Sequence, residues 1–206
     1  MRSCAFFVCG MAEMKELIYI HGFNSSPQSA KAQQLLAWAA QCRPDIRIHV
    51  PALPVDPENA LALLVASVQA CGSPPGLIGS SLGGFYANVL AARLGLRAVL
   101  INPAVHPHQL LAQHLGEISN YHTGEAAELR HEDIAVLAHM DVSPRHLERL
   151  WVLLETGDET LDYRQAADFY SACHVDITEG GSHAYEGFVA KLPSIVEFLN
   201  NQVVGR

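Results

Sequence analysis

Leu77-Ile78-Gly79-Ser80-Ser81-Leu82-Gly83-Gly84 is the stretch that decides the fold of this chain. It reads as a short buried strand that runs into Gly-x-Ser-x-Gly, and a helix-like run follows at once. A serine at the tip of such a turn takes a strained backbone conformation, and its neighbours must be small so that strand and helix can approach each other. Gly79 and Gly83 meet that requirement. The stretch therefore predicts Ser81 as an exposed nucleophile.

The same turn predicts where negative charge would be stabilised. A helix begins directly after Ser81, so the backbone N–H of Leu82 should point to the place where an oxyanion forms. The alternative is an ordinary Gly/Ser turn in an α/β domain, because this pentapeptide also occurs by chance. The rest of the chain decides between the two interpretations.

Composition restricts the classes of protein that the chain can belong to. Its 206 residues, 50% of them hydrophobic, suit one domain or one domain with an insertion. A net charge of −8 without a block of Lys or Arg disfavours nucleic acid and anionic membranes as partners. No apolar run approaches the ~20 residues of a membrane span. The 5 cysteines form no C-x-x-C pair, so we expect free thiols and a cytoplasmic protein.

The first 13 residues are expected to be a disordered or non-native extension, and residues 14–206 the domain. The apolar run Ala5 to Cys9 is shorter than the core of a signal peptide, and no convincing cleavage site follows it. Met11 and Met14 are alternative starts of the chain.

A second oxyanion donor is expected after the first strand. The strand Leu17–Ile20 leads into His21, Gly22 and Phe23. His-Gly after a strand is where α/β-hydrolases supply the second backbone donor, which here would be the N–H of Phe23. Gly22 would let the chain pass close to the substrate. The alternative is an ordinary loop with a buried histidine, and His21 itself is expected to be structural.

Strands and helices alternate along the chain. Helices are expected over 29–41, 57–71, 85–94, 163–173 and 188–201, and strands over 17–20, 46–50, 77–80, 98–101, 151–154 and 175–178. This alternation predicts a mostly parallel sheet of about six strands with helices on both faces, as in the α/β-hydrolase fold. The last helix could break at Pro193.

Residues 105–147 interrupt the alternation. Helices are expected over 107–115 and 132–139, with no strand between them. An insertion between two sheet strands predicts a small helical cap that excludes water and shapes the substrate pocket. The alternative is a surface excursion without substrate contact. His106 and His108 lack a carboxylate or cysteine at ligand spacing, so we expect solvated histidines and no metal site.

Three acids compete for the role of partner to a catalytic histidine. Asp158, Glu159 and Asp162 all follow the strand 151–154. Asp158 is preferred because it lies nearest to the strand end, whereas Asp162 is expected to cap the helix that begins at residue 163.

The candidate histidine is His183, which follows the last strand and a pair of glycines. The order Ser81, Asp158, His183 is that of α/β-hydrolases, opposite to the order in chymotrypsin. Each member follows a strand, and the ends of parallel strands share one edge of the sheet. We therefore expect the three side chains to converge.

The sequence resembles the YqiA-like esterases, a family of small bacterial α/β-hydrolases. The resemblance runs from about Leu17 to Leu199 and rests on five segments: Tyr19 to Pro27, Gly79 to Gly84, Asn102 to Ala104, Thr156 to Glu159, and Gly180 to Ala184. It implies esterase activity on acyl esters or thioesters, with Ser81, Asp158 and His183 as the triad.

The sequence therefore predicts a carboxylesterase or thioesterase with a Ser-His-Asp triad and an acyl-enzyme intermediate. No cofactor or metal is expected, and the expected partner is a small acyl ester or thioester, with acyl-CoA as one option. Two alternatives stay open: the same triad acting on a peptide or C–C bond, and a non-catalytic binding protein on a hydrolase fold. The sequence leaves the acyl length, the leaving group and the oligomeric state undetermined.

Overall fold

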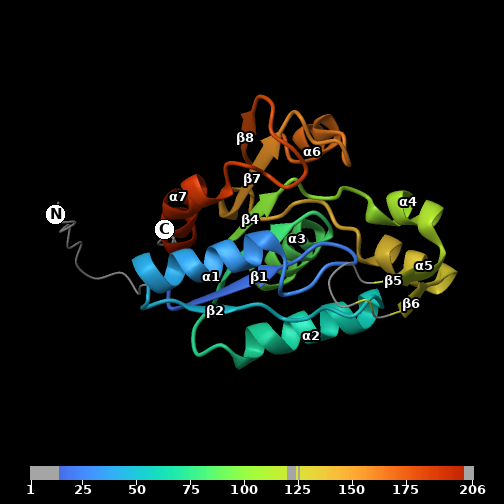
Figure 1. Cartoon of the computed structure of the whole chain (residues 1–206), viewed down its shortest axis with the longest axis horizontal. Helices are drawn as coiled ribbons and strands as arrows, with labels where there is room; N and C mark the ends of the chain where they lie inside the picture. The colour runs from blue at the N-terminus through green and yellow to red at the C-terminus, as the bar shows by residue number, and fades with distance from the viewer. Residues whose placement is uncertain (1–13, 120–123, 125, 202–206) are drawn as a thin grey trace.

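The computed structural model describes residues 14–119, 124 and 126–201, so the expected extension over residues 1–13 lies outside the described part. The described chain contains a parallel sheet of 6 strands in the order β2-β1-β3-β4-β7-β8 (Figure 1). Its strands are β1 (Glu16–Ile20), β2 (Arg47–His49), β3 (Gly76–Ser80), β4 (Ala98–Ile101), β7 (Leu150–Glu155) and β8 (His174–Thr178). The predicted α/β class and parallel sheet are confirmed.

The helices alternate with the strands, as predicted, and the last helix follows the last strand. They are α1 (Ala30–Cys42), α2 (Pro57–Ala70), α3 (Leu82–Leu94), α4 (Pro107–Leu111), α5 (His131–Met140), α6 (Tyr163–Phe169) and α7 (Phe188–Asn200), with 3₁₀ turns η1 (Ala112–His114) and η2 (Leu147–Arg149). None of the described helices is both long and apolar enough to cross a lipid bilayer.

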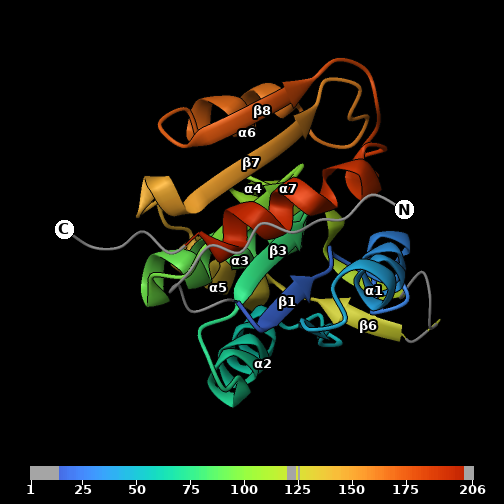
Figure 2. The same ribbon diagram turned by 90° about the vertical axis from the view of Figure 1, so that its left-hand side faces the viewer.

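A separate hydrophobic core covers each face of the sheet. Alternate strand residues point to opposite faces, so Leu17 and Tyr19 of β1 pack with α1 and α7, whereas Ile18 and Ile20 pack with α2 and α3. Figure 2 shows α1 and α2 on opposite sides of β1. Because both faces are covered, the inner strands are buried throughout, as expected for a parallel sheet.

The strand register brings the loops of the site to one edge. Ile20 lies opposite Gly79, and Ser80 lies opposite Ile101, which in turn lies opposite Leu153. The chain therefore leaves β1, β3, β4 and β7 at nearly the same level, and the segments that follow these strands meet there.

The expectation of no strand between the two insertion helices is wrong. β5 (Gly116–Ser119) and β6 (Ala126–Leu129) form an antiparallel pair there. Both strands are 4 residues long, and Ile118 and Leu129 are their large apolar residues. One such residue in each strand is too few for alternation to identify a strand from the sequence. This pair forms a separate sheet of 2 strands, apart from the hydrogen-bonded ladder of the main sheet. The role of the insertion as a cap stays a prediction.

The last helix continues through Pro193, whereas the sequence left a break there open. Proline removes the hydrogen bond to the carbonyl four residues earlier, which belongs to Val189. Pro193 and Val189 both lie on the exposed face of α7, where water can satisfy that carbonyl. The opposite face is buried and holds the helix in place.

Candidate active site

Ser81 stands at a strained turn between β3 and α3. Its φ of 56° and ψ of −123° lie outside the regions that non-glycine residues favour. A Cβ on Gly79 would clash with the carbonyl of Gly83, and a Cβ on Gly83 would clash with the carbonyl of Ile20. Both glycines are therefore required sterically, because strand, turn and helix touch through their backbones.

Backbone hydrogen bonds hold this turn in place. The N–H of Ser81 donates to the carbonyl of Ile101 at 3.0 Å, and the carbonyl of Ser81 accepts from Gly84 at 2.9 Å and Ala104 at 3.0 Å. The turn is thus tied to the end of β4 and to its own helix. Several hydrogen bonds from neighbouring elements can keep a residue in a strained backbone conformation.

Asp158 faces the ring of His183. Its Oδ2 lies 2.8 Å and its Oδ1 3.0 Å from Nδ1 of the imidazole. Oδ1 also accepts from the backbone N–H groups of Thr160 at 2.9 Å and Leu161 at 2.8 Å. Burial on its own would raise the pKa of the Asp158 carboxyl, but the hydrogen bonds from His183, Leu161 and Thr160 outweigh burial and lower it. This carboxylate is therefore ionised at neutral pH, and its position is fixed.

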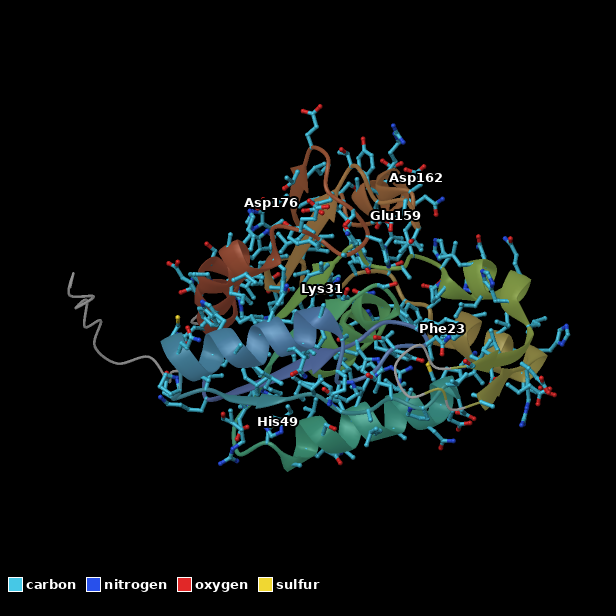
Figure 3. All side chains as sticks on the ribbon, in the orientation of Figure 1. Phe23, Lys31, His49, Glu159, Asp162 and Asp176 are labelled. Carbon is cyan, nitrogen blue, oxygen red and sulfur yellow. The ribbon has the colours of Figure 1, made fainter. Side chains whose placement is uncertain are left out.

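The two competing acids make other contacts. Glu159 accepts the backbone N–H of His183 at 3.0 Å, and this hydrogen bond is the main cause that lowers the pKa of its carboxyl. Asp162 is the N-cap of α6, where its side chain accepts from the N–H of Arg164 at 3.0 Å. Figure 3 shows Glu159 and Asp162 near α6. Of the three acids, Asp158 is the one that contacts the imidazole.

Ser81 and His183 line one cavity of about 550 Å³, together with Gly22 and Phe23 of the loop after β1. A Cβ on Gly22 would lie 3.2 Å from the Cβ of Ser81, so this loop runs directly beside the serine. The backbone N–H groups of Phe23 and Leu82 thus belong to the two segments that flank Ser81. No metal or cofactor role follows from these residues.

His21 is buried beneath the loop, as expected for a structural residue. Its Nε2 accepts the backbone N–H of Leu53 at 3.1 Å, and its Nδ1 lies 3.0 Å from the carbonyl of Gly22. These contacts fix the direction in which the loop leaves β1.

Glu155 is a functional candidate that the sequence analysis missed. Its side chain is buried with the residue only 2% exposed, and it accepts backbone N–H groups from the loop that carries His183. These donors are Ser182 at 2.9 Å, Glu186 at 3.0 Å and Gly187 at 3.3 Å. One carboxylate at the end of β7 therefore holds the loop on both sides of the histidine.

Asn102 and Lys31 hold the same loop through its carbonyls. Asn102 donates to Ser182 at 3.0 Å and to His183 at 3.3 Å, and its Oδ1 accepts the N–H of Glu155 at 3.0 Å. Lys31 on α1 donates to Ala184 at 2.7 Å. Burial lowers the pKa of the Lys31 amine to about 8, although Glu155 and Asp158 act in the opposite direction. Asn102 lies in one of the segments on which the family resemblance rests, so the sequence offered a signal for this residue.

A hydrogen bond joins the insertion between β4 and β7 to the loop that follows β1. Asn24, in the loop after β1, donates to the carbonyl of Ser119 in β5 at 2.6 Å. His106 and His108 are not simply solvated as expected, because their Nδ1 atoms lie 2.6 and 3.4 Å from Oδ2 of Asp141. The sequence could not show this contact, since Asp141 is 35 residues from His106.

The model of an uncharacterised protein family, UPF0227, matches residues 16–200. The chain belongs to the UPF0227 family. A UPF0227 protein from Shewanella sp. (strain ANA-3) is 28% identical over 192 residues, which covers 88% of this chain and 98% of the relative. One from Serratia proteamaculans is 29% identical over 156 residues, 74% of this chain and 80% of the relative. UPF0227 is the YqiA family, so the predicted membership is confirmed.

Solved structures show the fold of this UPF0227 chain. Est1E from Butyrivibrio proteoclasticus, solved with ferulic acid bound, has a TM-score of 0.72 at 14% identity, covering 94% of this chain and 91% of Est1E. The mouse alpha/beta hydrolase domain-containing protein 10 has a TM-score of 0.68 at 14% identity, covering 89% and 88%. The fold is therefore that of the α/β-hydrolases, as predicted.

Proposed function

We propose that this protein is a serine hydrolase that cleaves small carboxylic esters or thioesters. The observation that carries the proposal is the contact between Asp158 and Nδ1 of His183, 2.8 Å long, beside a cavity that both His183 and Ser81 line. An acid, an imidazole and a strained serine at one sheet edge are the parts of a nucleophilic triad.

The geometry supports a definite division of roles. With Nδ1–H of His183 donating to Asp158, Nε2 is free of that bond and accepts the proton of Ser81 as its hydroxyl attacks the acyl carbonyl. The Oγ–C bond forms, and the carbonyl π electrons move to the oxygen. His183 then returns the proton to the leaving alcohol or thiol as the C–O or C–S bond breaks. Water repeats the sequence on the acyl-enzyme and releases the acid.

The backbone N–H groups of Phe23 and Leu82 would stabilise the oxyanion. Removal of one such donor raises the barrier by about 3 kcal/mol in known cases. Gly22 permits the close approach, because a side chain there would crowd Ser81. In this scheme Asp158 keeps its charge throughout, orients the imidazole and stabilises the imidazolium.

The cavity favours a small substrate. Its volume of about 550 Å³ lies within the range of small-molecule sites, roughly 300–1,000 Å³. The three described cysteines, Cys42, Cys71 and Cys173, are free thiols, in keeping with the cytoplasm as the compartment that we propose.

A fluorophosphonate probe tests the proposal directly. It should label wild-type protein at Ser81 and leave folded Ser81→Ala unlabelled, and Ser81→Ala should lose ester hydrolysis by several orders of magnitude, up to roughly 10⁶ in kcat. A folded Ser81→Ala variant that kept more than a few per cent of the activity would contradict the assignment.

A substrate panel then separates the hydrolase classes. It should contain p-nitrophenyl esters of graded acyl length, acyl-CoA thioesters, peptides and a feruloyl ester, the last because Est1E was solved with ferulic acid. We expect turnover of short esters or thioesters and none of peptides. Turnover of peptides alone would support the alternative in which the proposed triad hydrolyses peptide bonds. Absence of labelling by the fluorophosphonate probe would favour a non-catalytic binding protein.

A further inference from the structure

Three side chains of the types that bind transition metals meet at the end of the sheet opposite to Ser81. Glu16 opens β1, His49 ends β2 and Cys71 follows α2. One ligand atom from each lies within 4.8 Å of the other two, and no other group of three such residues does so in the described part of the chain. Figure 3 shows His49 close to α2 and well away from Phe23 of the candidate active site.

The carboxylate of Glu16 is already held as an anion. Glu16 is buried, yet its Oε2 lies 2.5 Å from Nε2 of His49 and its Oε1 lies 3.6 Å from the guanidinium of Arg47. The hydrogen bond with His49 is the main cause that lowers the pKa of Glu16. Its backbone is held by the neighbouring edge strand, because Glu16 lies opposite Arg47 in the register of β1 and β2.

The thiol of Cys71 completes the cluster. It is half-buried and free of any disulfide, and its Sγ lies 3.3 Å from the carbonyl of Ser67. Burial and the charge of Glu16 raise the pKa of this thiol. A thiolate beside a carboxylate is unfavourable in the absence of a cation, and a divalent ion between the two removes that repulsion.

We propose that Glu16, His49 and Cys71 form a binding site for a divalent transition-metal ion of the zinc type. The ligands would be a carboxylate oxygen of Glu16, Nε2 of His49 and Sγ of Cys71, with water in the fourth position of a tetrahedron. Carboxylate, imidazole and thiolate are the ligands that zinc selects. Binding breaks the S–H bond and forms a metal–sulfur bond, and the proton passes to solvent.

The cluster needs only a small rearrangement to take the ion. Bonds of about 2.0–2.3 Å in a tetrahedron place ligand atoms roughly 3.2–3.8 Å apart. The contact between His49 and Glu16 must therefore open from 2.5 Å, and the more distant pairs must close from within the 4.8 Å limit. His49 stands at the end of an edge strand, and the side chain of Arg47 is 74% exposed, so both can move toward solvent.

The position of the site indicates a structural role. Within the described residues, β2 is an edge strand of 3 residues whose one partner is β1. The proposed ligands come from β1, from β2 and from the segment that leads out of α2, so a bound ion would fasten the edge strand to two neighbours. The loops of the candidate active site follow the last residues of β1 and β3, whereas Glu16 opens β1 and Cys71 precedes β3. The ion should therefore affect stability and not turnover.

Cobalt(II) gives a direct test, because a cobalt–thiolate bond produces a charge-transfer absorption in the near ultraviolet. Untagged, metal-free full-length protein is titrated with Co²⁺ under reducing conditions. We expect one equivalent to produce this band together with tetrahedral visible bands, and Cys71→Ser and His49→Gln to abolish or strongly weaken them. Cys173→Ser is the matched control, since Cys173 is a second half-buried free thiol, next to His174.

Zinc supplies a second readout that is independent of the spectrum. At a hundredfold excess over its Kd, Zn²⁺ should raise the Tm of wild type by roughly 5–10 °C. The Tm of Cys71→Ser should not respond, and ester hydrolysis by wild type should be the same with and without zinc. Absence of the thiolate band in wild type, its survival in Cys71→Ser, or an equal Tm rise in that variant would overturn the proposal. Because no readout depends on catalysis, failure of the hydrolase proposal would leave this test intact.

Discussion

Replacement of Glu155 by alanine should loosen the loop of His183 without replacing any residue of the proposed triad. The carboxylate accepts three backbone N–H groups, from Ser182, Glu186 and Gly187. Hydrogen bonds to a charged group contribute about 1.5–3 kcal/mol each, which gives an upper bound of roughly 5–9 kcal/mol for three. Ser182 and Gly187 are only half-buried, so water can replace part of this loss.

We therefore expect Glu155→Ala to lower the free energy of unfolding by roughly 2–4 kcal/mol, which is a fall in Tm of about 5–15 °C. A displacement of the imidazole by about 1 Å can cost ~10² in rate, so kcat for an ester should fall by that order. Two matched variants separate the causes. Glu155→Gln keeps one acceptor oxygen and should fall between wild type and alanine. Glu159→Gln keeps an acceptor oxygen for the one backbone N–H that Glu159 binds, that of His183, so its effect on Tm should be much smaller than that of Glu155→Ala.

Thermal melts, ester kinetics and amide hydrogen exchange provide the readouts. Exchange should accelerate at Ser182, Glu186 and Gly187 in Glu155→Ala, and the amides of β1 should keep their protection. The reasoning would be refuted by a Glu155→Ala variant whose kcat stays within threefold of wild type and whose loop amides keep their protection. It would also fail if Glu159→Gln had the larger effect on Tm.

Three further results are expected. Asp158→Asn should lower kcat/KM by about 10⁴, because an amide favours the wrong tautomer of the His183 imidazole. Asp162→Asn should change kcat/KM only slightly. A larger loss at Asp162 would assign the role of the acidic partner of His183 to that residue. Burial lowers the pKa of Lys31 to about 8, so above that pH the unfolded chain binds more protons than the folded chain. Urea melts should therefore show that wild type gains stability relative to Lys31→Met between pH 8 and about 10.5. A stability difference that does not change with pH would show that the amine is not desolvated. Gly83→Ala should lower Tm by more than about 10 °C or prevent folding, because the added Cβ would meet the backbone of β1. Gly72→Ala should melt like wild type, because no atom lies within 4 Å of its added Cβ. Equal melting temperatures for the two variants would contradict the steric argument.

Local signals in the sequence predicted most of the fold. Apolar runs that alternate with helical patterns gave the strands and helices, and parallel topology followed from that alternation. The insertion was the exception. The sequences of β5 and β6, Gly-Glu-Ile-Ser and Ala-Ala-Glu-Leu, are only 4 residues long, and Ile118 and Leu129 are their large apolar residues. Their pairing depends on each other and on neighbouring elements, which periodicity within one short segment does not reveal.

By itself, the sequence determined the candidate nucleophile, because the strained turn at Ser81 leaves a local signature in Gly79 and Gly83. It also gave the order of the three residues of the proposed triad and the strand that each of them follows. Only the tertiary structure decided that Asp158 is the acid that contacts His183, whereas Glu159 and Asp162 make other contacts.

Only the tertiary structure, too, brought Glu155, Asn102 and Lys31 around the loop of His183, and Glu16, His49 and Cys71 to one point. The physical reason is the same in both cases. A hydrogen bond or a shared ligand site depends on side chains from separate strands and helices, and their distance is fixed by sheet register and helix packing. Hydrophobic periodicity fixes which face a residue takes, but it carries no information about which distant residue will stand opposite.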